Sequence, residues 1–224
     1  MPADQCGSEE VGIDLVAPNL LIVLDRSCSM RNKVGTQSKW EIAVAAVKKL
    51  GSSYQGLIRF GMTLFPDTTG DNCTQSKIPV PIAVGAEAQI QSLLSAALKT
   101  TDPYYPDGPC VTNIDTAMQQ AASEPALADT TRASYALLIT DGNQAGCNVA
   151  GGDAGTTQII KDLYTKKKVP TFVVGFGSAV DPAQLTIFAD AGGKPAAGAT
   201  HFYKAEDQAS LDAALKVISK QAAS

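Results

Sequence analysis

Short apolar runs alternate with amphipathic stretches along most of the chain. Three runs are almost continuously apolar, which is typical of buried strands in a parallel sheet: Asn19–Leu24, Tyr135–Thr140 and Val169–Val174. Between and after these runs, apolar residues recur at helical spacing. The helices predicted in this way are Lys39–Ser53, Glu87–Leu98, Asn113–Ser123, Thr156–Lys167, one opening at Asp181 and Pro182, and one marked by Leu211 to Ile218. Strands that alternate with helices predict a doubly wound α/β fold.

Three further segments complete the predicted sheet, namely Leu57–Phe65, Lys77–Val84 and Thr200–Tyr203. The second of them contains Pro79 and Pro81, which have no backbone N–H group to donate to a neighbouring strand. We therefore place this segment at an edge of the sheet. The sheet is expected to have six strands, with helices on both of its faces.

The 224-residue chain is predicted to form one domain over residues 19–224, because no linker, repeat or low-complexity segment divides it. Met1–Pro18 is polar and aperiodic, and we expect it to be a loosely ordered lead-in. It has neither the basic region nor the apolar region of a signal peptide. Apolar runs such as Leu20–Leu24 are far shorter than the roughly 18 residues of a membrane helix, so we expect no membrane insertion.

The charge balance and the histidine content exclude several classes of function. With 18 basic and 22 acidic side chains, the formal net charge of −4 gives no basic footprint for nucleic acid. His201 is the only histidine in the sequence, which excludes multi-histidine zinc sites and an H-E-x-x-H motif. The sequence also lacks the G-x-S-x-G motif of many serine hydrolases. We expect His201 to be structural and the protein not to be an enzyme.

Oxygen-bearing side chains follow two of the predicted buried strands. Asp25, Ser27 and Ser29 form a D-x-S-x-S sequence after the first strand, Asp141 follows the second, and Thr112 precedes a helix. In such sheets, ligands bind outside the carboxyl ends of the strands. Five oxygen ligands without nitrogen or thiolate indicate a site for a hard cation, Mg²⁺ or Mn²⁺, with Ca²⁺ as an alternative. Because only two of the five are anionic, such a cation would readily accept a further carboxylate from outside.

This set of residues resembles the metal-ion-dependent adhesion site (MIDAS) of von Willebrand factor type A domains. The D-x-S-x-S sequence, a threonine that opens a helix and a T-D-G sequence after a later strand occur in the order found in that family. The resemblance covers roughly Asn19 to Gln221, and it implies a three-layer, mostly parallel six-stranded sheet with one antiparallel edge strand. It also implies that Ser27 and Ser29 coordinate the cation directly and Thr112 directly or through water, while Asp25 and Asp141 act through water.

The resemblance implies a protein-binding module that holds Mg²⁺ or Mn²⁺ and engages an aspartate or glutamate carboxylate of a protein or surface ligand. Such a module would act outside the cytoplasm in adhesion or recognition, as a monomeric domain of a larger protein. A shift of its last helix would tune its affinity. Two alternatives stay open: a metal-dependent hydrolase or phosphoester enzyme, and a structural domain that binds no cation. Against the enzyme, a D-x-D phosphotransferase would need a carboxylate where Ser27 stands.

The five cysteines lack the spacing of a zinc ribbon or a C-x-x-C redox pair; they are Cys6, Cys28, Cys73, Cys110 and Cys147. If the strand at 57–65 runs parallel to the first strand, all except Cys6 lie at the edge that carries the oxygen ligands. Four cysteines at one edge indicate two disulfides and an oxidising, extracytoplasmic compartment. Three pairings are open, and reduced buried cysteines are the alternative. A bound metal, as the resemblance implies, would draw two of the loops together, which favours Cys28–Cys110 with Cys73–Cys147 and leaves Cys6 over.

Two loops allow more than one interpretation. The G-x-G sequence that begins at Gly175 partly matches a dinucleotide-binding fingerprint, but Val180 stands where the third glycine would be, and we do not interpret the segment as a cofactor loop. The acidic segment Asp102–Asp107 contains Tyr104 and Tyr105 and lies shortly before the candidate threonine ligand. It is either ordinary loop surface or part of the partner-binding surface, because tyrosines are frequent anchors in interfaces.

Overall fold

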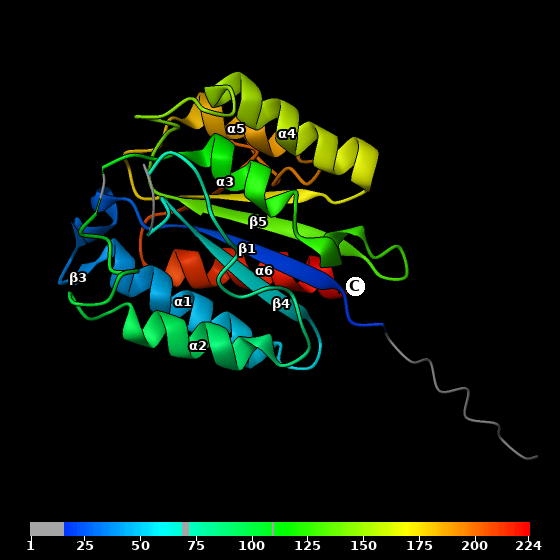
Figure 1. Cartoon of the computed structure of the whole chain (residues 1–224), viewed down its shortest axis with the longest axis horizontal. Helices are drawn as coiled ribbons and strands as arrows, with labels where there is room; N and C mark the ends of the chain where they lie inside the picture. The colour runs from blue at the N-terminus through cyan, green and yellow to red at the C-terminus, as the bar shows by residue number, and fades with distance from the viewer. Residues whose placement is uncertain (1–15, 69–71, 109) are drawn as a thin grey trace, which may run out of the picture.

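The computed structural model describes residues 16–68, 72–108 and 110–224, so most of the predicted lead-in lies outside the described residues. A central sheet of five parallel strands has the order β4-β1-β5-β6-β7 (Figure 1). These strands are β1 (Asn19–Asp25), β4 (Arg59–Phe65), β5 (Ser134–Thr140), β6 (Thr171–Phe176) and β7 (Tyr203–Ala205). A separate antiparallel pair joins β2 (Lys33–Val34) to β3 (Gln37–Ser38).

Helices cover both faces of the sheet, which confirms the predicted three-layer α/β architecture (Figure 1). One face carries α1 (Lys39–Ser53), α2 (Ala86–Ala96) and α6 (Gln208–Ala223). The other face carries α3 (Ile114–Ala121), α4 (Gly152–Lys167) and α5 (Pro182–Ala191). Two short 3-10 helices lie in loops, η1 (Cys28–Arg31) and η2 (Pro125–Ala128).

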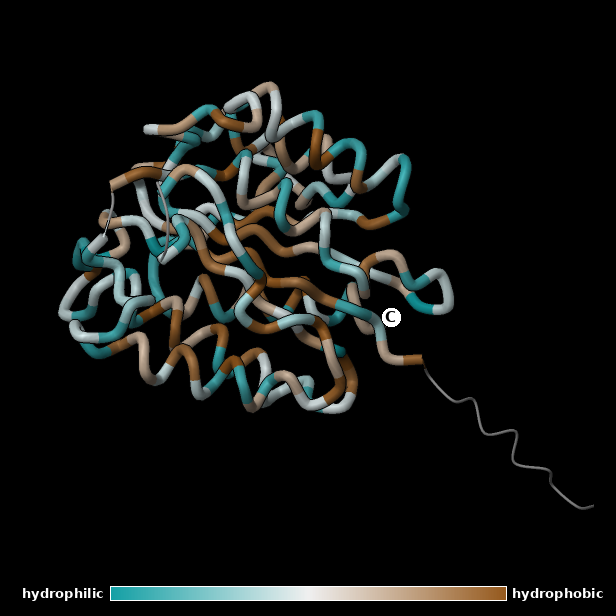
Figure 2. Tube along the Cα trace, in the orientation of Figure 1, coloured by the Kyte–Doolittle hydropathy of each residue, from teal (hydrophilic) through white to brown (hydrophobic). Residues whose placement is uncertain are grey.

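Strand β1, which lies between β4 and β5, is buried on both faces, as its continuous apolar sequence predicts. Leu20, Ile22 and Leu24 pack into the core under α1, α2 and α6. Leu21 and Val23 point the other way, into the core under α3, α4 and α5. The strands at the centre of the sheet are accordingly the most continuously hydrophobic part of the chain (Figure 2). Burial of apolar surface on both sides therefore fixes the frame that carries the ends of β1 and β5.

The predicted sixth strand over Lys77–Val84 is wrong in its extent, although its position at the edge is right. The segment pairs with β4 through a single antiparallel bridge, in which Met62 N donates to Val80 O (2.7 Å) and Val80 N donates to Met62 O (3.2 Å). Pro79 and Pro81 flank Val80, and their backbone nitrogens face away from β4, so these positions offer no N–H group to a further strand on the outer side of the edge. The antiparallel edge consists of this one bridged pair and of a hydrogen bond from Ala83 N to Phe60 O (3.2 Å).

Helix α1 has the predicted bounds, and a capping box fixes its start. The hydroxyl of Ser38 accepts from Glu41 N (3.1 Å), and the Glu41 carboxylate accepts from Ser38 N (2.6 Å), which forms a capping box. This cap makes Lys39 the first residue of the helix, directly below the carboxyl edge of the sheet. Within the described part of the chain, no helix is both long and apolar enough to cross a membrane.

Candidate metal centre

The structure places the five predicted oxygen ligands together at the carboxyl ends of β1 and β5, which are adjacent strands. Asp25 is the last residue of β1, and Ser27 and Ser29 lie in the turn that follows it. Asp141 comes directly after β5. Thr112 lies before α3 and is held at the same edge by a backbone bridge to Ala145, with N···O distances of 2.9 and 3.0 Å.

Hydrogen bonds link three of the five side chains directly, and Asp25 joins them through the backbone of Ser27. Ser27 Oγ lies 3.0 Å from Ser29 Oγ, and Ser29 Oγ donates to Asp141 Oδ1 at 2.7 Å. Asp25 Oδ1 accepts from the backbone N of Ser27 at 2.7 Å. Asp25 Oδ2 accepts from Thr140 Oγ1 at 2.7 Å. The turn after β1 is therefore locked to the turn after β5.

The Thr112 hydroxyl approaches this cluster from the α3 side. A Cβ atom on Gly142 would lie 3.6 Å from Thr112 Oγ1, so this hydroxyl sits beside the turn that contains Asp141. Its Oγ1 makes no hydrogen bond to the other four side chains, all of which the structure describes. Thr112 is thus brought to the same edge as the others, with its hydroxyl available to a ligand.

The Asp25 carboxylate is held in an unfavourable electrostatic environment. Asp25 and Asp141 are both completely buried. Burial and the nearby charge of Asp141 raise the pKa of Asp25 from 3.8 to about 6, against the lowering effect of its bonds to Thr140 and Ser27. A cation beside Asp25 would offset both the burial of its charge and the repulsion from Asp141.

Sequence reasoning missed a buried lysine at this centre. Lys39 Nζ donates to Asp141 Oδ2 at 2.7 Å, and the lysine side chain is only 8% exposed. Its aliphatic stem passes over Gly177, where a Cβ atom would lie 2.9 Å from Lys39 Cε. Gly177 has a φ of +91°, a conformation that other residues rarely adopt. The only sequence signal for this role is a lysine at the first position of a helix, where acidic residues are usual.

The donor set fits a hard divalent cation. In the described ranges, no group of three or more histidine, cysteine, aspartate or glutamate side chains is placed to hold a metal, so hydroxyls must supply part of any coordination shell. Ser27, Ser29 and Thr112 supply three neutral oxygens beside two buried carboxylates. Such an all-oxygen set suits Mg²⁺ or Mn²⁺ better than Zn²⁺, which favours nitrogen and sulfur.

Two disulfides join the loops at this edge, and their pairing confirms the favoured prediction. Cys28 is bonded to Cys110, which ties the D-x-S-x-S turn to the segment that ends at Thr112. Cys73 is bonded to Cys147. Cys6 lies outside the described residues. Since Cys28 stands between two candidate serine ligands, the first disulfide limits how far the serine and threonine loops can move apart.

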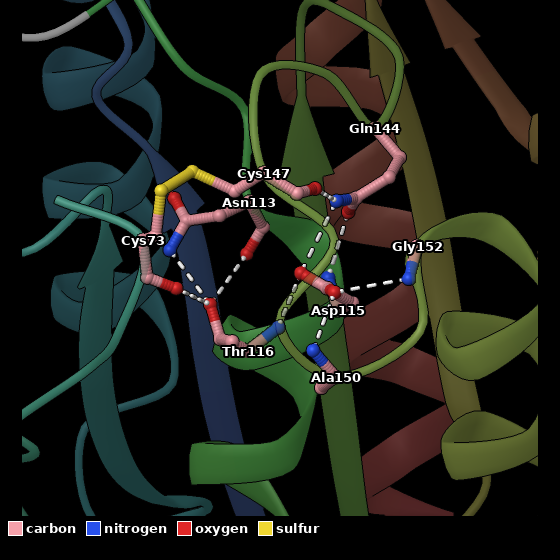
Figure 3. The surroundings of a disulfide bond; sticks show 8 residues. All are labelled: Cys73, Asn113, Asp115, Thr116, Gln144, Cys147, Ala150 and Gly152. Carbon is pink, nitrogen blue, oxygen red and sulfur yellow. Dashed lines mark hydrogen bonds between the residues drawn. A yellow bond between two sulfur atoms is a disulfide. The ribbon is translucent and has the colours of Figure 1, made fainter.

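The second disulfide lies above the start of α3 in a dense set of polar contacts (Figure 3). Thr116 Oγ1 donates to Cys73 O at 2.8 Å. The buried carboxylate of Asp115 accepts from the backbone N atoms of Ala150 (2.9 Å) and Gly152 (3.0 Å). These contacts anchor the loop that follows Asp141 to the helix that follows Thr112, so the second disulfide supports the site from outside.

The remaining candidate residues lie outside the oxygen cluster. His201 stands before the amino end of β7, at the opposite edge of the sheet, and its Nδ1 lies 2.5 Å from Asp190 Oδ1. Tyr104 and Tyr105 are half-buried and pack against the core under α1 and α2. The buried part of each ring contributes to the core. Contact of the exposed part with a partner stays a prediction.

Comparisons with known proteins agree with this fold. A family model described as the von Willebrand factor type A domain matches residues 19–217. No curated protein sequence matches the chain. Among solved structures, the chain is similar to proximal thread matrix protein 1 from the mussel byssus, with 17% identity and a TM-score of 0.63 over 91% of this chain and 47% of that one. Another structure of the mussel protein is described as having a zinc-occupied MIDAS motif.

Two bacterial proteins have similar folds. The pilus adhesin SpaC from Lactobacillus rhamnosus GG has 14% identity and a TM-score of 0.66, over 93% of this chain and 31% of that one. The PilB minor pilin from Streptococcus sanguinis has 16% identity and a TM-score of 0.63, over 93% of this chain and 62% of that one. The chain therefore spans less than half of the mussel and Lactobacillus proteins. Because the family model extends from β1 into α6, the chain belongs to the von Willebrand factor type A domain family.

Proposed function

We propose that this domain is a metal-dependent adhesion module, which binds an aspartate or glutamate side chain of a protein or surface ligand through a divalent cation. The observation that carries the proposal is the pair of buried carboxylates, Asp25 and Asp141, set beside three hydroxyls at the carboxyl edge of the sheet. The proposed ligands are Asp25, Ser27, Ser29, Thr112 and Asp141, and the proposed cation is Mg²⁺ or Mn²⁺.

The hydrogen bonds orient the hydroxyl oxygens for this role. Ser29 donates its one hydroxyl proton to Asp141, so the proton between Ser27 and Ser29 belongs to Ser27. Each hydroxyl oxygen then keeps at least one lone pair that no hydrogen bond within this pair uses, and it could coordinate a cation. A cation held there would supply a positive centre with a coordination position for an external carboxylate.

The arrangement favours binding over catalysis. Each carboxylate oxygen of the cluster already has a donor within the chain: Asp25 accepts from Ser27 N and Thr140, and Asp141 accepts from Ser29 and Lys39. A general base needs a carboxylate or imidazole that is free to take a proton from a substrate. Turnover of a generic phosphoester that depended on Asp25 would contradict the proposed binding role.

The disulfides and the structural relatives support a place outside the cytoplasm. Disulfides persist in oxidising compartments and are rare in the cytosol. The similar structures include a pilus adhesin, a minor pilin and a byssus matrix protein, each longer than this chain. We propose accordingly that the domain is one part of a larger extracellular or surface protein and acts as a monomeric unit within it.

The test is thermal or chemical unfolding with and without millimolar Mg²⁺ or Mn²⁺, on the wild type and on a Ser27→Ala/Ser29→Ala variant. A ligand that binds only the folded state raises the free energy of unfolding by about 2.7 kcal/mol at one hundred times its Kd. We expect this gain in the wild type and its loss in the variant. The matched control is Ser52→Ala/Ser95→Ala, which changes two exposed serines on α1 and α2 and should keep the full gain.

If neither cation stabilises the wild type, the unfolding is repeated with added acetate, because a carboxylate ligand would strengthen a weakly bound cation. An absence of any cation effect with acetate present would overturn the proposed function.

A further inference from the structure

Lys39 occupies a position that is electrostatically unfavourable for a lysine. It is the first residue of α1, where the helix dipole disfavours a positive charge. Its side chain is also withdrawn from water, with 8% exposure. A buried cation at a helix amino end contributes little to stability by itself, so the reason for its placement lies in the group that it contacts.

The surroundings of Lys39 direct its ammonium group to the metal centre. Gly177 leaves room for the stem, and the ammonium ends 2.7 Å from Asp141 Oδ2. The other oxygen of the same carboxylate accepts from the candidate ligand Ser29. Asp141 is therefore shared between a fixed cation of the chain and the cluster that would hold the metal.

This sharing changes the charge available to the metal. Asp25 and Asp141 contribute −2, and Lys39 brings the sum of the three side chains to −1. Arg26 is buried nearby and donates to Pro103 O; its charge interaction with Asp25 is weaker than those with Asp107 and Asp67, so it is not counted in this sum. A divalent cation in this cluster would keep an uncompensated charge of +1, which one external carboxylate would neutralise.

We propose that Lys39 weakens the affinity of the site for the metal alone and thereby couples metal binding to binding of the partner's carboxylate. The inference rests on the proposed function and adds to it a residue that sets cooperativity. Metal and carboxylate each bind weakly without the other and tightly together, because coupling between two ligands is reciprocal. Lys39 is a positioning and charge-setting residue and does not contact either ligand itself.

The experiment measures Mn²⁺ binding by the electron paramagnetic resonance signal of the free ion, with acetate as the carboxylate probe and chloride at matched ionic strength. For the wild type, we expect acetate to tighten Mn²⁺ binding by about tenfold or more. For Lys39→Met, we expect binding without acetate to be at least about tenfold tighter than in the wild type, and the effect of acetate to fall to about twofold. Lys39→Gln, which keeps a hydrogen-bond donor near Asp141, should behave in the same way.

The matched control is Lys49→Met. Lys49 lies on the same helix and pairs with Asp212 at the surface, so this variant loses the same charge away from the centre. It should keep wild-type Mn²⁺ affinity and the wild-type effect of acetate. Circular dichroism verifies that each variant is folded. If Lys39→Met does not fold, the comparison with the wild type is made with Lys39→Gln.

The possible outcomes separate the two proposals. Equal or weaker Mn²⁺ binding by the folded Lys39 variants, with an unchanged acetate effect, overturns the role of Lys39 and leaves the metal site standing. An absence of Mn²⁺ binding by the wild type and by the variants, with and without acetate, overturns the metal site itself. Tighter metal binding with a reduced acetate effect supports both.

Discussion

Aspartates stand at both ends of the parallel sheet, and their surroundings are opposite in kind. At the carboxyl end, Asp25 is completely buried beside Asp141, and its pKa is raised to about 6 by burial and by that neighbouring charge. At the amino end, Asp129 is half-exposed, accepts from Thr131 and pairs with Arg132 Nε at 2.7 Å. These hydrogen bonds, that of Thr131 first, lower the pKa of Asp129 to about 2.

The opposite pKa shifts point to different roles for the two aspartates. Asp129 stabilises the fold, whereas Asp25 is suited to a bound cation. Asp129 finds its partners within the chain, including Arg59 Nη1 at 4.0 Å, so ionisation of this aspartate favours the folded state. Asp25 is ionised only against burial and repulsion, so its charge disfavours the folded state, and the proposed cation would offset this effect. Stored repulsion of this kind is characteristic of binding sites.

The largest effect expected at the carboxyl end comes from its cross-links. Removal of Cys28–Cys110 by a double serine substitution, or of Cys73–Cys147 in the same way, should lower the free energy of unfolding by about 4 kcal/mol, because the loops enclosed are long. The bonded residues are 82 and 74 positions apart in sequence. Denaturant unfolding in the presence of a chelator measures both losses.

The two disulfide variants also serve as controls for each other. Only the first disulfide directly ties Ser27 and Ser29 to the Thr112 segment, so its loss should also reduce the stabilisation by Mg²⁺, whereas loss of the second should reduce it less. If both variants kept the wild-type response to Mg²⁺, the tether would have no part in holding the ligands.

A smaller effect is expected from Asp25→Asn. The folded pKa of Asp25 is about 6 and its ordinary value is 3.8, so the stability that this group contributes is complete below about pH 4 and is lost as the pH rises through 6. Metal-free wild type should therefore lose about 2 kcal/mol across this window, and the variant should not. Unfolding at pH 4, 5, 6 and 7 with a chelator measures the difference.

The variant has a second expected property. Asp25→Asn should be more stable than the metal-free wild type at pH 7 and should fail to gain stability from Mg²⁺. A metal-free pH profile of the variant that parallels the wild type would show that Asp25 is not the source of the repulsion.

The smallest effect is expected from Asp129→Asn at the amino end, with the opposite sign. The pKa of Asp129 is lowered from 3.8 to about 2, so the stability that it contributes is present above about pH 4 and is lost as the pH falls through 2. We expect a small fall in Tm at pH 7, weakened by salt because the group is exposed, and no change in the response to Mg²⁺. An altered Mg²⁺ response would contradict the separation between the two ends.

The sequence predicts most of the frame and the whole oxygen set, because both depend on order along the chain. A strand that ends in Asp25 and another that ends before Asp141 must meet at one edge if the sheet is parallel. The edge segment around Val80 is predicted too long, because the residue types alone do not show that its regular pairing with β4 is limited to one bridged pair. Lys39 is missed because a lysine at the start of a helix is usually at the surface, and only the space over Gly177 reveals its inward course.

The relation between the metal centre and the chain ends has a mechanical consequence. β1 begins at the amino edge of the sheet, and α6 ends near the same edge, where Gln221 Nε2 donates to Tyr203 at the start of β7 (Figure 1). A partner held at the metal centre and a neighbouring segment attached at either end would pull from opposite edges. Tension would then run along β1 and load its hydrogen bonds with β4 and β5 in shear, while the two disulfides would limit how far the loops around the metal could be drawn out.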